Sequence, residues 1–231
     1  MLYQYGTMAG LVGRALSGKQ TVEELVQHGN FGIGTFHGVD GEMVVLDGKV
    51  YKIDYTGKAQ LSAKDETTPF ATVTNFKPVY SKKSTANFEN FLSDVAEHLN
   101  PNYFYAIKMT GTFKSVSTRI VKKQEEPYPT LLGLTKNQSV YNYENTTGVI
   151  VGFFSPSYSL GLSDGSLHIH YLSDDKTQGG HIFNFEIADA LVEISDPLDF
   201  MLELPKTKEY AAMELDSKTM HAEIHKAEAG E

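Results

Sequence analysis

Three histidines have the spacing of a metal site. His168 and His170 are separated by one residue in SLHIHYL, and His181 follows two glycines in DDKTQGGH. Side chains alternate along a β-strand, so the first two imidazoles would project from the same face. The loop after them is rich in turn formers, and a hairpin there would bring His181 beside the pair. Three neutral imidazoles match a catalytic zinc site with a position left open for water or substrate.

Alternatives to this interpretation remain within the sequence. The closely spaced pair can be two surface residues on an exposed strand, and the third histidine after the glycine turn is what favours metal binding. A second pair, His221 and His225 in HAEIH, has the i, i+4 spacing of one helix face. Glu223 stands third in that motif, so the H-E-x-x-H order of zinc proteases is not reproduced. We interpret this second pair as a solvated helix face.

Composition excludes several classes of function. The net charge is −9 and the Lys and Arg residues are scattered, which argues against a nucleic-acid partner. The chain has no cysteine, so a transition-metal site must use His, Asp or Glu. The beginning, MLYQYGTMAGLVGRAL, lacks a signal-peptide pattern, and no apolar stretch approaches the length of a membrane span. We expect a cytoplasmic protein with no membrane partner.

The first half predicts a short helix followed by a β-meander. Thr21 and Glu24 form a capping box, with Gly29 as a natural helix end. From Phe31, the runs GIGTFHGV, EMVVL and KVYKI are separated by Asp-Gly pairs, which are strong hairpin signals. The pattern places Thr35 on the first strand. It places Glu42 just past a tight turn, at the start of the second strand.

The remaining chain predicts one more helix and a second sheet. NFENFLSDVAEHL has helical spacing and ends at Asn100-Pro101. YFYAIKMTGTFKSVSTRIV is β-like and carries Arg119 near its end, and four further β-like runs follow, which predict an antiparallel sheet. The prolines of QEEPYPTLLG suggest a soft boundary between subdomains 1–125 and 126–231 that form one catalytic unit. The tail from about 213 to 229 has helical composition, as a terminal helix or a frayed end.

Four ordered blocks carry a family resemblance. They are YQYGTMAGLVGRAL, GIGTFHGVDGEM, TRIVKKQEEPYP and HIHYLSDDKTQGGH, and through them the chain resembles the alpha-acetolactate decarboxylase family. With the elements above, the resemblance implies an α+β, β-rich fold of two packed subdomains. These would have mixed and antiparallel sheets, with the zinc site on the C-terminal sheet. A homodimer formed through sheet edges is also implied.

The resemblance further implies a reaction, the decarboxylation of (S)-2-acetolactate to (R)-acetoin and CO2, a step of acetoin and butanediol formation. The substrate would be a small anionic 2-hydroxy-3-oxo acid, and the cofactor would be Zn²⁺, which stabilises an enediolate. The implied residues are His168, His170 and His181 as metal ligands, Glu42, Arg119 and Glu228 as catalytic groups, and Thr35 and Arg119 as substrate contacts.

Roles follow from the chemistry of these side chains. Arg119 would orient the substrate or hold its developing oxyanion, because a fork of donors suits a carboxylate or enediolate. Glu42 would handle the proton that arrives at carbon on one face. These two residues can instead form a structural ion pair. At the C-terminus, Glu228 fits best by its place in IHKAE, with Glu223 as the alternative.

Two rival functions are weighed against the decarboxylase. Cupin-like metal enzymes also use two histidines one residue apart, but Asp174 sits where that pattern has Glu. The second rival is a small-ligand binding module in which the histidine cluster is structural. Imidazole ligands also suit divalent ions other than zinc.

Overall fold

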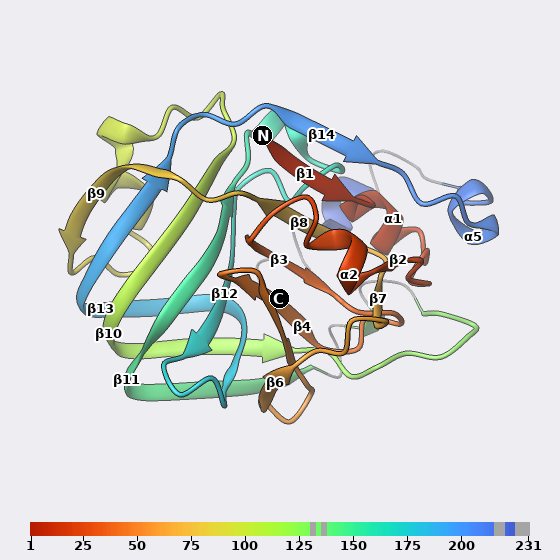
Figure 1. The fold of residues 1–231 in the computed structure, drawn as a ribbon, viewed down its shortest axis with the longest axis horizontal. Coiled ribbons are helices and arrows are strands. Elements are labelled where there is room, and N and C mark those ends of the chain that lie inside the picture. The colour runs from red at the N-terminus through yellow and green to blue at the C-terminus, as the bar shows by residue number, and fades with distance from the viewer. Residues whose placement is uncertain (130–132, 135–137, 215–219, 225–231) are drawn as a thin grey trace.

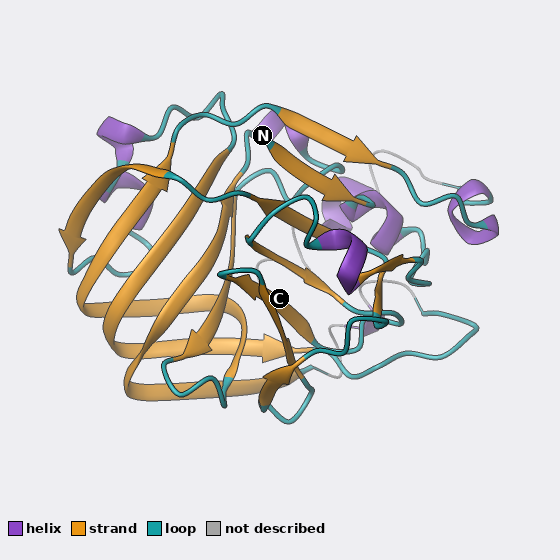
Figure 2. Ribbon diagram, viewed as in Figure 1, coloured by secondary structure: helices purple, strands orange, loops and turns teal. Residues whose placement is uncertain are grey.

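The protein is built mainly from β-strands, which form two large sheets. The computed structural model describes residues 1–129, 133–134, 138–214 and 220–224. Figure 2 shows how far strands predominate over helices. The β-rich fold with one mixed and one antiparallel sheet, predicted from the sequence, is confirmed.

The mixed sheet has seven strands in the order β14-β1-β8-β3-β4-β5-β6. All its neighbouring strands are antiparallel except β1 and β14, which run parallel. The strands are β1 (Leu2–Tyr5), β3 (Phe31–Thr35), β4 (Glu42–Leu46), β5 (Lys49–Ile53), β6 (Ala59–Leu61), β8 (Ala71–Thr74) and β14 (Phe200–Glu203). A separate two-stranded sheet pairs β2 (Gln20–Thr21) with β7 (Thr67–Thr68).

The predicted meander is present as β3, β4 and β5. Its second connection is a tight Asp47-Gly48 turn, in which both residues have positive φ, 52° and 75°. The first connection differs from the prediction, because residues 36–41 form a six-residue loop between Thr35 and Glu42 in place of a tight turn. These two residues nevertheless pair directly across β3 and β4. The loop therefore begins and ends at two predicted site residues.

The antiparallel sheet contains the longest strands. Its order is β10-β11-β12-β13-β9, and β10 also pairs with β13, so β10, β11, β12 and β13 close into a ring. The strands are β9 (Pro78–Ser84), β10 (Tyr105–Ile120), β11 (Ser139–Phe154), β12 (Leu167–Ser173) and β13 (Gly179–Ser195). The last two predicted β-runs form the single strand β13. Figure 1 shows that β10, β11 and β13 bend sharply along their length.

The two sheets pack against each other through a shared apolar core. Ile33 and Val44 of the mixed sheet lie in the same buried cluster as Val149, Val151 and Leu172 of the antiparallel sheet. Each sheet also takes strands from both halves of the chain, since β10 belongs to the antiparallel sheet and β14 to the mixed one. The boundary between residues 125 and 126 stays a prediction.

The helices are short. Among the described residues, the named helices are α1 (Met8–Val12), α2 (Val22–Leu25), α3 (Phe91–Asp94) and α5 (Lys208–Ala211), with 3-10 turns η1 (Ala96–His98) and η2 (Ser157–Ser159). The capping box of Thr21 and Glu24 is present, but α2 ends at Leu25, before Gly29. None of the described helices is long and apolar enough to cross a membrane.

The helix predicted over 88–99 is broken into α3 and η1. Lys82 donates a hydrogen bond to the backbone carbonyl of Asp94 at 2.9 Å, and the next turn continues with the 3-10 bond from His98 N to Val95 O. A tertiary contact thus takes the acceptor that a longer α-helix would use. In the tail predicted from about 213 to 229, residues 220–224 are helical, and residues 215–219 and 225–229 lie outside the described part.

Candidate metal centre

Strand register brings three of the predicted site residues into one row across the antiparallel sheet. Arg119 of β10 pairs with His181 of β13, and His181 pairs with His170 of β12. Directly paired residues on neighbouring strands project to the same side, so the three side chains share a face. His168 lies two residues before His170 and joins them there. The hairpin predicted to bring His181 beside the pair is present.

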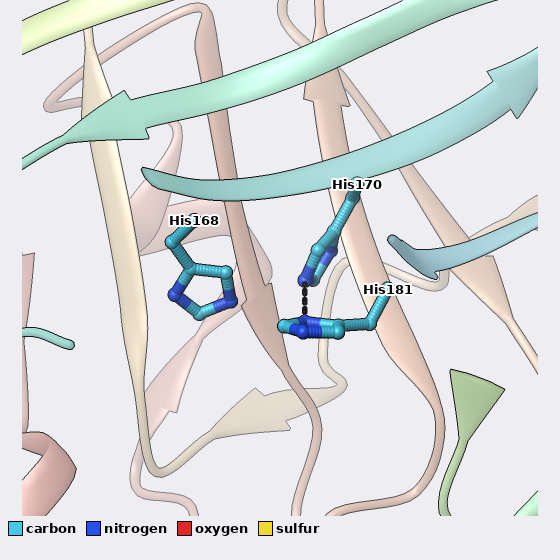
Figure 3. A group of neighbouring side chains, drawn as sticks. All are labelled: His168, His170 and His181. Atoms are coloured by element: carbon cyan, nitrogen blue, oxygen red, sulfur yellow. Dashed lines mark hydrogen bonds between the residues drawn. The ribbon is translucent and has the colours of Figure 1, made fainter. Parts of the chain in front are cut away.

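The three imidazoles surround a common point. Their ring centroids lie 5.0 to 5.3 Å apart, and one ligand nitrogen from each lies within 4.8 Å of the others. Figure 3 shows the rings of His170 and His181 in contact, with His168 facing them across the gap. His170 and His181 are buried, and His168 is partly so. Three nitrogen donors at this spacing fit a divalent transition metal, so the histidines can hold one.

Hydrogen bonds fix how two of the rings are oriented. His170 Nδ1 lies 2.9 Å from the carbonyl oxygen of Met43, and its Nε2 lies 3.3 Å from His181 Nδ1. Arg119 Nη2 lies 3.2 Å from His181 Nε2. A guanidinium only donates, so His181 Nε2 accepts and its Nδ1 carries hydrogen toward His170. His170 then donates from Nδ1 to Met43, a residue of the mixed sheet.

The mixed sheet also supplies a carboxylate. Glu42 Oε2 lies 3.4 Å from His170 Nε2, and its side chain is only 12% exposed. Thr35, its cross-strand neighbour, is buried and donates its hydroxyl hydrogen to the carbonyl of Gly41 at 2.7 Å. The predicted residues Thr35, Glu42 and Arg119 are thus brought to the histidine cluster. Their roles stay predictions.

Lys52 anchors the loop that leads into Glu42. Its ammonium lies 2.8 Å from Asp40 and 2.7 Å from Glu66. Burial alone would lower the pKa of Lys52, but the hydrogen bonds to the two carboxylates outweigh it and raise the pKa. Burial likewise opposes the charge on Glu66, and the hydrogen bonds from Lys52 and Ser62 leave its pKa below the usual value. This charged cluster holds the 36–41 loop against β5.

A cavity of about 90 Å³ opens over the cluster. Besides the three histidines, its polar wall comprises Thr35, Glu42, Arg119 and Gln138. Its apolar wall includes Met8, Leu11, Val39, Phe70 and Val121. A small, mostly apolar cavity with a few converging polar groups suits a small ligand that has both polar and apolar parts.

The C-terminal candidates are placed only in part. Glu228 and His225 lie outside the described residues, and Glu223 is half-buried. Ile224 is fully buried and packs in one cluster with Met8 and Leu11, which line the cavity. Within the described ranges, the three-histidine group is the metal-binding candidate that the side-chain geometry provides.

Two polar groups near the site were missed by the sequence analysis. Gln138 stands just before β11 and lines the cavity, and Asp164 is a buried aspartate in the loop before β12. Asp164 Oδ2 lies 3.9 Å from His168 Nδ1. The i, i+4 spacing of Asp164 and His168 gave no signal, because it suggests proximity only on a helix and this segment is not helical.

Imidazoles that converge beside a carboxylate and a guanidinium, at the base of a small cavity, are typical of a metalloenzyme active site. Comparison with known proteins gives the family. The sequence model of the alpha-acetolactate decarboxylase family matches residues 2–217. The chain is 38% identical to the alpha-acetolactate decarboxylase of Brevibacillus brevis, over 99% of this chain and 81% of that protein. It is 36% identical to that of Bacillus licheniformis, over 98% of this chain and 91% of that protein.

A solved structure gives the same answer. The crystal structure of alpha-acetolactate decarboxylase from Bacillus subtilis superimposes with a TM-score of 0.95 at 33% identity, covering 100% of this chain and 99% of that one. The chain belongs to the alpha-acetolactate decarboxylase family, and is therefore a carboxy-lyase. The resemblance seen in the sequence is confirmed, and it favours this class over a cupin-like enzyme or a binding module.

Proposed function

We propose that the protein catalyses the zinc-dependent decarboxylation of (S)-2-acetolactate to (R)-acetoin and CO2. The observation that carries the proposal is the row of Arg119, His181 and His170, with Glu42 3.4 Å from His170. It puts a permanent cation and a carboxylate beside three metal-binding nitrogens in one small cavity. Family membership over residues 2–217 supports the choice of substrate.

The reaction breaks one carbon–carbon bond and consumes one proton. CO2 leaves from C2, the electron pair passes to the adjacent ketone to give an enediolate, and a proton then adds at C2. Zinc held by His168, His170 and His181 would act as a Lewis acid that stabilises negative charge developing on the substrate oxygens. The protein's own side chains must orient the carboxylate and deliver the proton.

Arg119 binds and orients the anion. Its guanidinium is buried at the base of the cavity, where a charge-assisted contact is stronger than in water. Two parallel donors fit a carboxylate or an enediolate and restrict how it can rotate. The apolar wall receives the two methyl groups, and Thr35 offers a hydroxyl oxygen beside Glu42.

Glu42 delivers the proton to one face of C2. Its side chain is only 12% exposed and lies beside His170, so the proton that it carries would reach C2 from that side of the cavity. A general acid in the site contributes about 10²- to 10⁴-fold to a proton-transfer step. The single enantiomer of the product would follow from this one-sided delivery. Glu228 is proposed as a further catalytic group from the C-terminal segment.

The direct test is to supply the protein with racemic 2-acetolactate. CO2 and acetoin are followed with purified protein, with a chelator, and after zinc, manganese or cobalt is restored, and the acetoin enantiomers are separated. Turnover that requires the metal and gives (R)-acetoin supports the proposal. Acetoin formation that never exceeds the spontaneous rate refutes it.

Three variants assign the roles. His168→Ala should lose metal and activity together. Glu42→Gln should retain metal but lose about 10²- to 10⁴-fold in kcat and form less of the single enantiomer. Glu144→Gln, an exposed residue of β11, is the matched control and should behave as the wild type.

The proposal includes a cytoplasmic homodimer. β14 is an edge strand of the mixed sheet. Met201 within this strand is 44% exposed, and Leu204, which directly follows it, is 47% exposed. An edge strand with exposed apolar side chains suits pairing with a second copy. Light scattering of the purified protein measures the assembly, and cell fractionation measures the compartment.

A further inference from the structure

Asp164 is unusual among the acidic residues of this chain. Among the Asp and Glu residues that the structure describes, it alone is buried, with 5% of its surface exposed. It lies in the loop that joins η2 to β12, four residues before His168. Charged carboxylates are rarely buried in proteins unless another group compensates the charge.

The carboxylate points toward a metal-ligand histidine. Its Oδ2 lies 3.9 Å from His168 Nδ1, and its Oδ1 accepts a hydrogen bond from the backbone N–H of Ser166 at 3.3 Å. The Asp164 side chain is 3% exposed and that of His168 is 13% exposed, so both lie mostly away from bulk water. A cavity of about 10 Å³ adjoins the two residues, with Thr72, Ser155 and Ser163 also in its wall. That is room for about one water molecule or for a small closing movement.

The three histidines differ in what contacts the outer nitrogen. His170 donates from Nδ1 to a backbone carbonyl, and His181 accepts from Arg119 at Nε2. His168 faces a carboxylate from its Nδ1. An imidazole that donates to a carboxylate holds its hydrogen on that nitrogen and presents the lone pair of the other one.

We propose that Asp164 is a positioning residue for the metal site, which holds His168 with Nδ1 outward and Nε2 toward His170 and His181. The carboxylate makes His168 a stronger ligand than a histidine with a neutral outer partner. This inference rests on the metal-dependent function proposed above. It adds a residue that does not touch substrate and acts only through His168.

The test measures metal binding in the absence of substrate. Zinc affinity is determined by chelator competition for the wild type, Asp164→Asn and Asp164→Leu, and the cobalt-loaded proteins are compared by visible absorption. Asp164→Asn should bind zinc about tenfold more weakly, and Asp164→Leu about 10- to 100-fold more weakly, with a shifted cobalt spectrum. Asp174→Asn makes the same change at an exposed position of the β12–β13 loop and should match the wild type.

The wild-type protein provides a second measurement that needs no variant. Long-range nitrogen NMR of the zinc-loaded protein should find hydrogen on Nδ1 of His168. Metal on Nδ1, or wild-type zinc affinity in both Asp164 variants, overturns the inference. Weakened zinc binding in these variants, with no acetoin formed by the wild type, would leave the inference standing and reject the reaction. A wild type that binds no divalent metal rejects both.

Discussion

Gly152→Ala tests whether the β11–β12 ladder positions the metal ligands. Gly152 lies in β11 and pairs with Ile169, the residue between His168 and His170. A Cβ at position 152 would lie 2.0 Å from the backbone oxygen of His168. Since real Cβ contacts under 3.0 Å essentially do not occur, and the oxygen belongs to the backbone, the strands must separate by about 1 Å.

The expected losses of stability and of zinc affinity follow from that displacement. A ladder hydrogen bond of about 2.9 Å stretched by 1 Å leaves the hydrogen-bonding range. Losing the two nearest bonds, at about 0.5–1.5 kcal/mol each, lowers the free energy of unfolding by about 1–3 kcal/mol. Zinc–nitrogen bonds are about 2.0–2.1 Å with a tolerance of about 0.2 Å, so His168 would leave the coordination range. We expect zinc affinity to fall at least about 10- to 100-fold, because displacing a ligand costs more than removing the hydrogen-bond partner of one.

The assay compares unfolding of the metal-free proteins in urea with zinc affinity from chelator competition. Gly48→Ala is the matched control, because its φ is +75° and nothing lies within 4 Å of the added Cβ. This control should lose about 1–2 kcal/mol of stability from backbone strain alone. Its zinc affinity should equal that of the wild type. Wild-type zinc affinity in Gly152→Ala would refute the reasoning, whatever its stability.

Three further predictions concern Arg119, Lys52 and the C-terminal glutamates. Arg119→Lys should lower kcat/KM about 10- to 100-fold without weakening zinc binding, because an ammonium cannot make two parallel hydrogen bonds to the substrate; unchanged kinetics would contradict the proposed role. Lys52→Met should lower the free energy of unfolding by about 1–2 kcal/mol at pH 7. The folded pKa of Glu66 is depressed below 4.5, so the stability that the Lys52–Glu66 ion pair contributes is present above about pH 4.5 and is lost as the pH falls through the folded pKa. Urea unfolding at pH 3 should therefore show a smaller difference in stability between Lys52→Met and the wild type. Glu228→Gln should lower kcat and Glu223→Gln should not, because the sequence resemblance fits Glu228 best; the reverse result would assign the catalytic glutamate to the half-buried Glu223.

The local patterns that predicted the site depend on short-range geometry. Strand alternation predicted that His168 and His170 share a face, and the turn formers after them predicted the hairpin that pairs His170 with His181. The Asp-Gly signals predicted the meander, and they placed Thr35 on its first strand and Glu42 at the start of its second, where the two residues lie. Each of these inferences depends only on residues that are close in sequence or are joined by a single turn.

Contacts between distant segments were beyond the sequence pattern. The ring of β10 to β13 depends on pairing between Arg119 and His181, which are 62 residues apart, and no local signal gives that register. The break in the 88–99 helix depends on Lys82 reaching the carbonyl of Asp94. The carbonyl of Met43 that accepts from His170 is a backbone group, so its role leaves no mark on the residue type.

His181 has one lone pair to give, and this limits how the site can work. In the arrangement seen here, Arg119 uses that lone pair, since its guanidinium can only donate and lies 3.2 Å from Nε2. If His181 instead gives the lone pair to a metal ion, its other nitrogen carries hydrogen and neither ring nitrogen can accept from Arg119. This guanidinium donor must then turn to another acceptor, and the proposed substrate brings a carboxylate into the same cavity. Under the proposed function, the cross-strand pair of Arg119 and His181 would therefore couple loading of the metal site to the availability of Arg119 for the substrate.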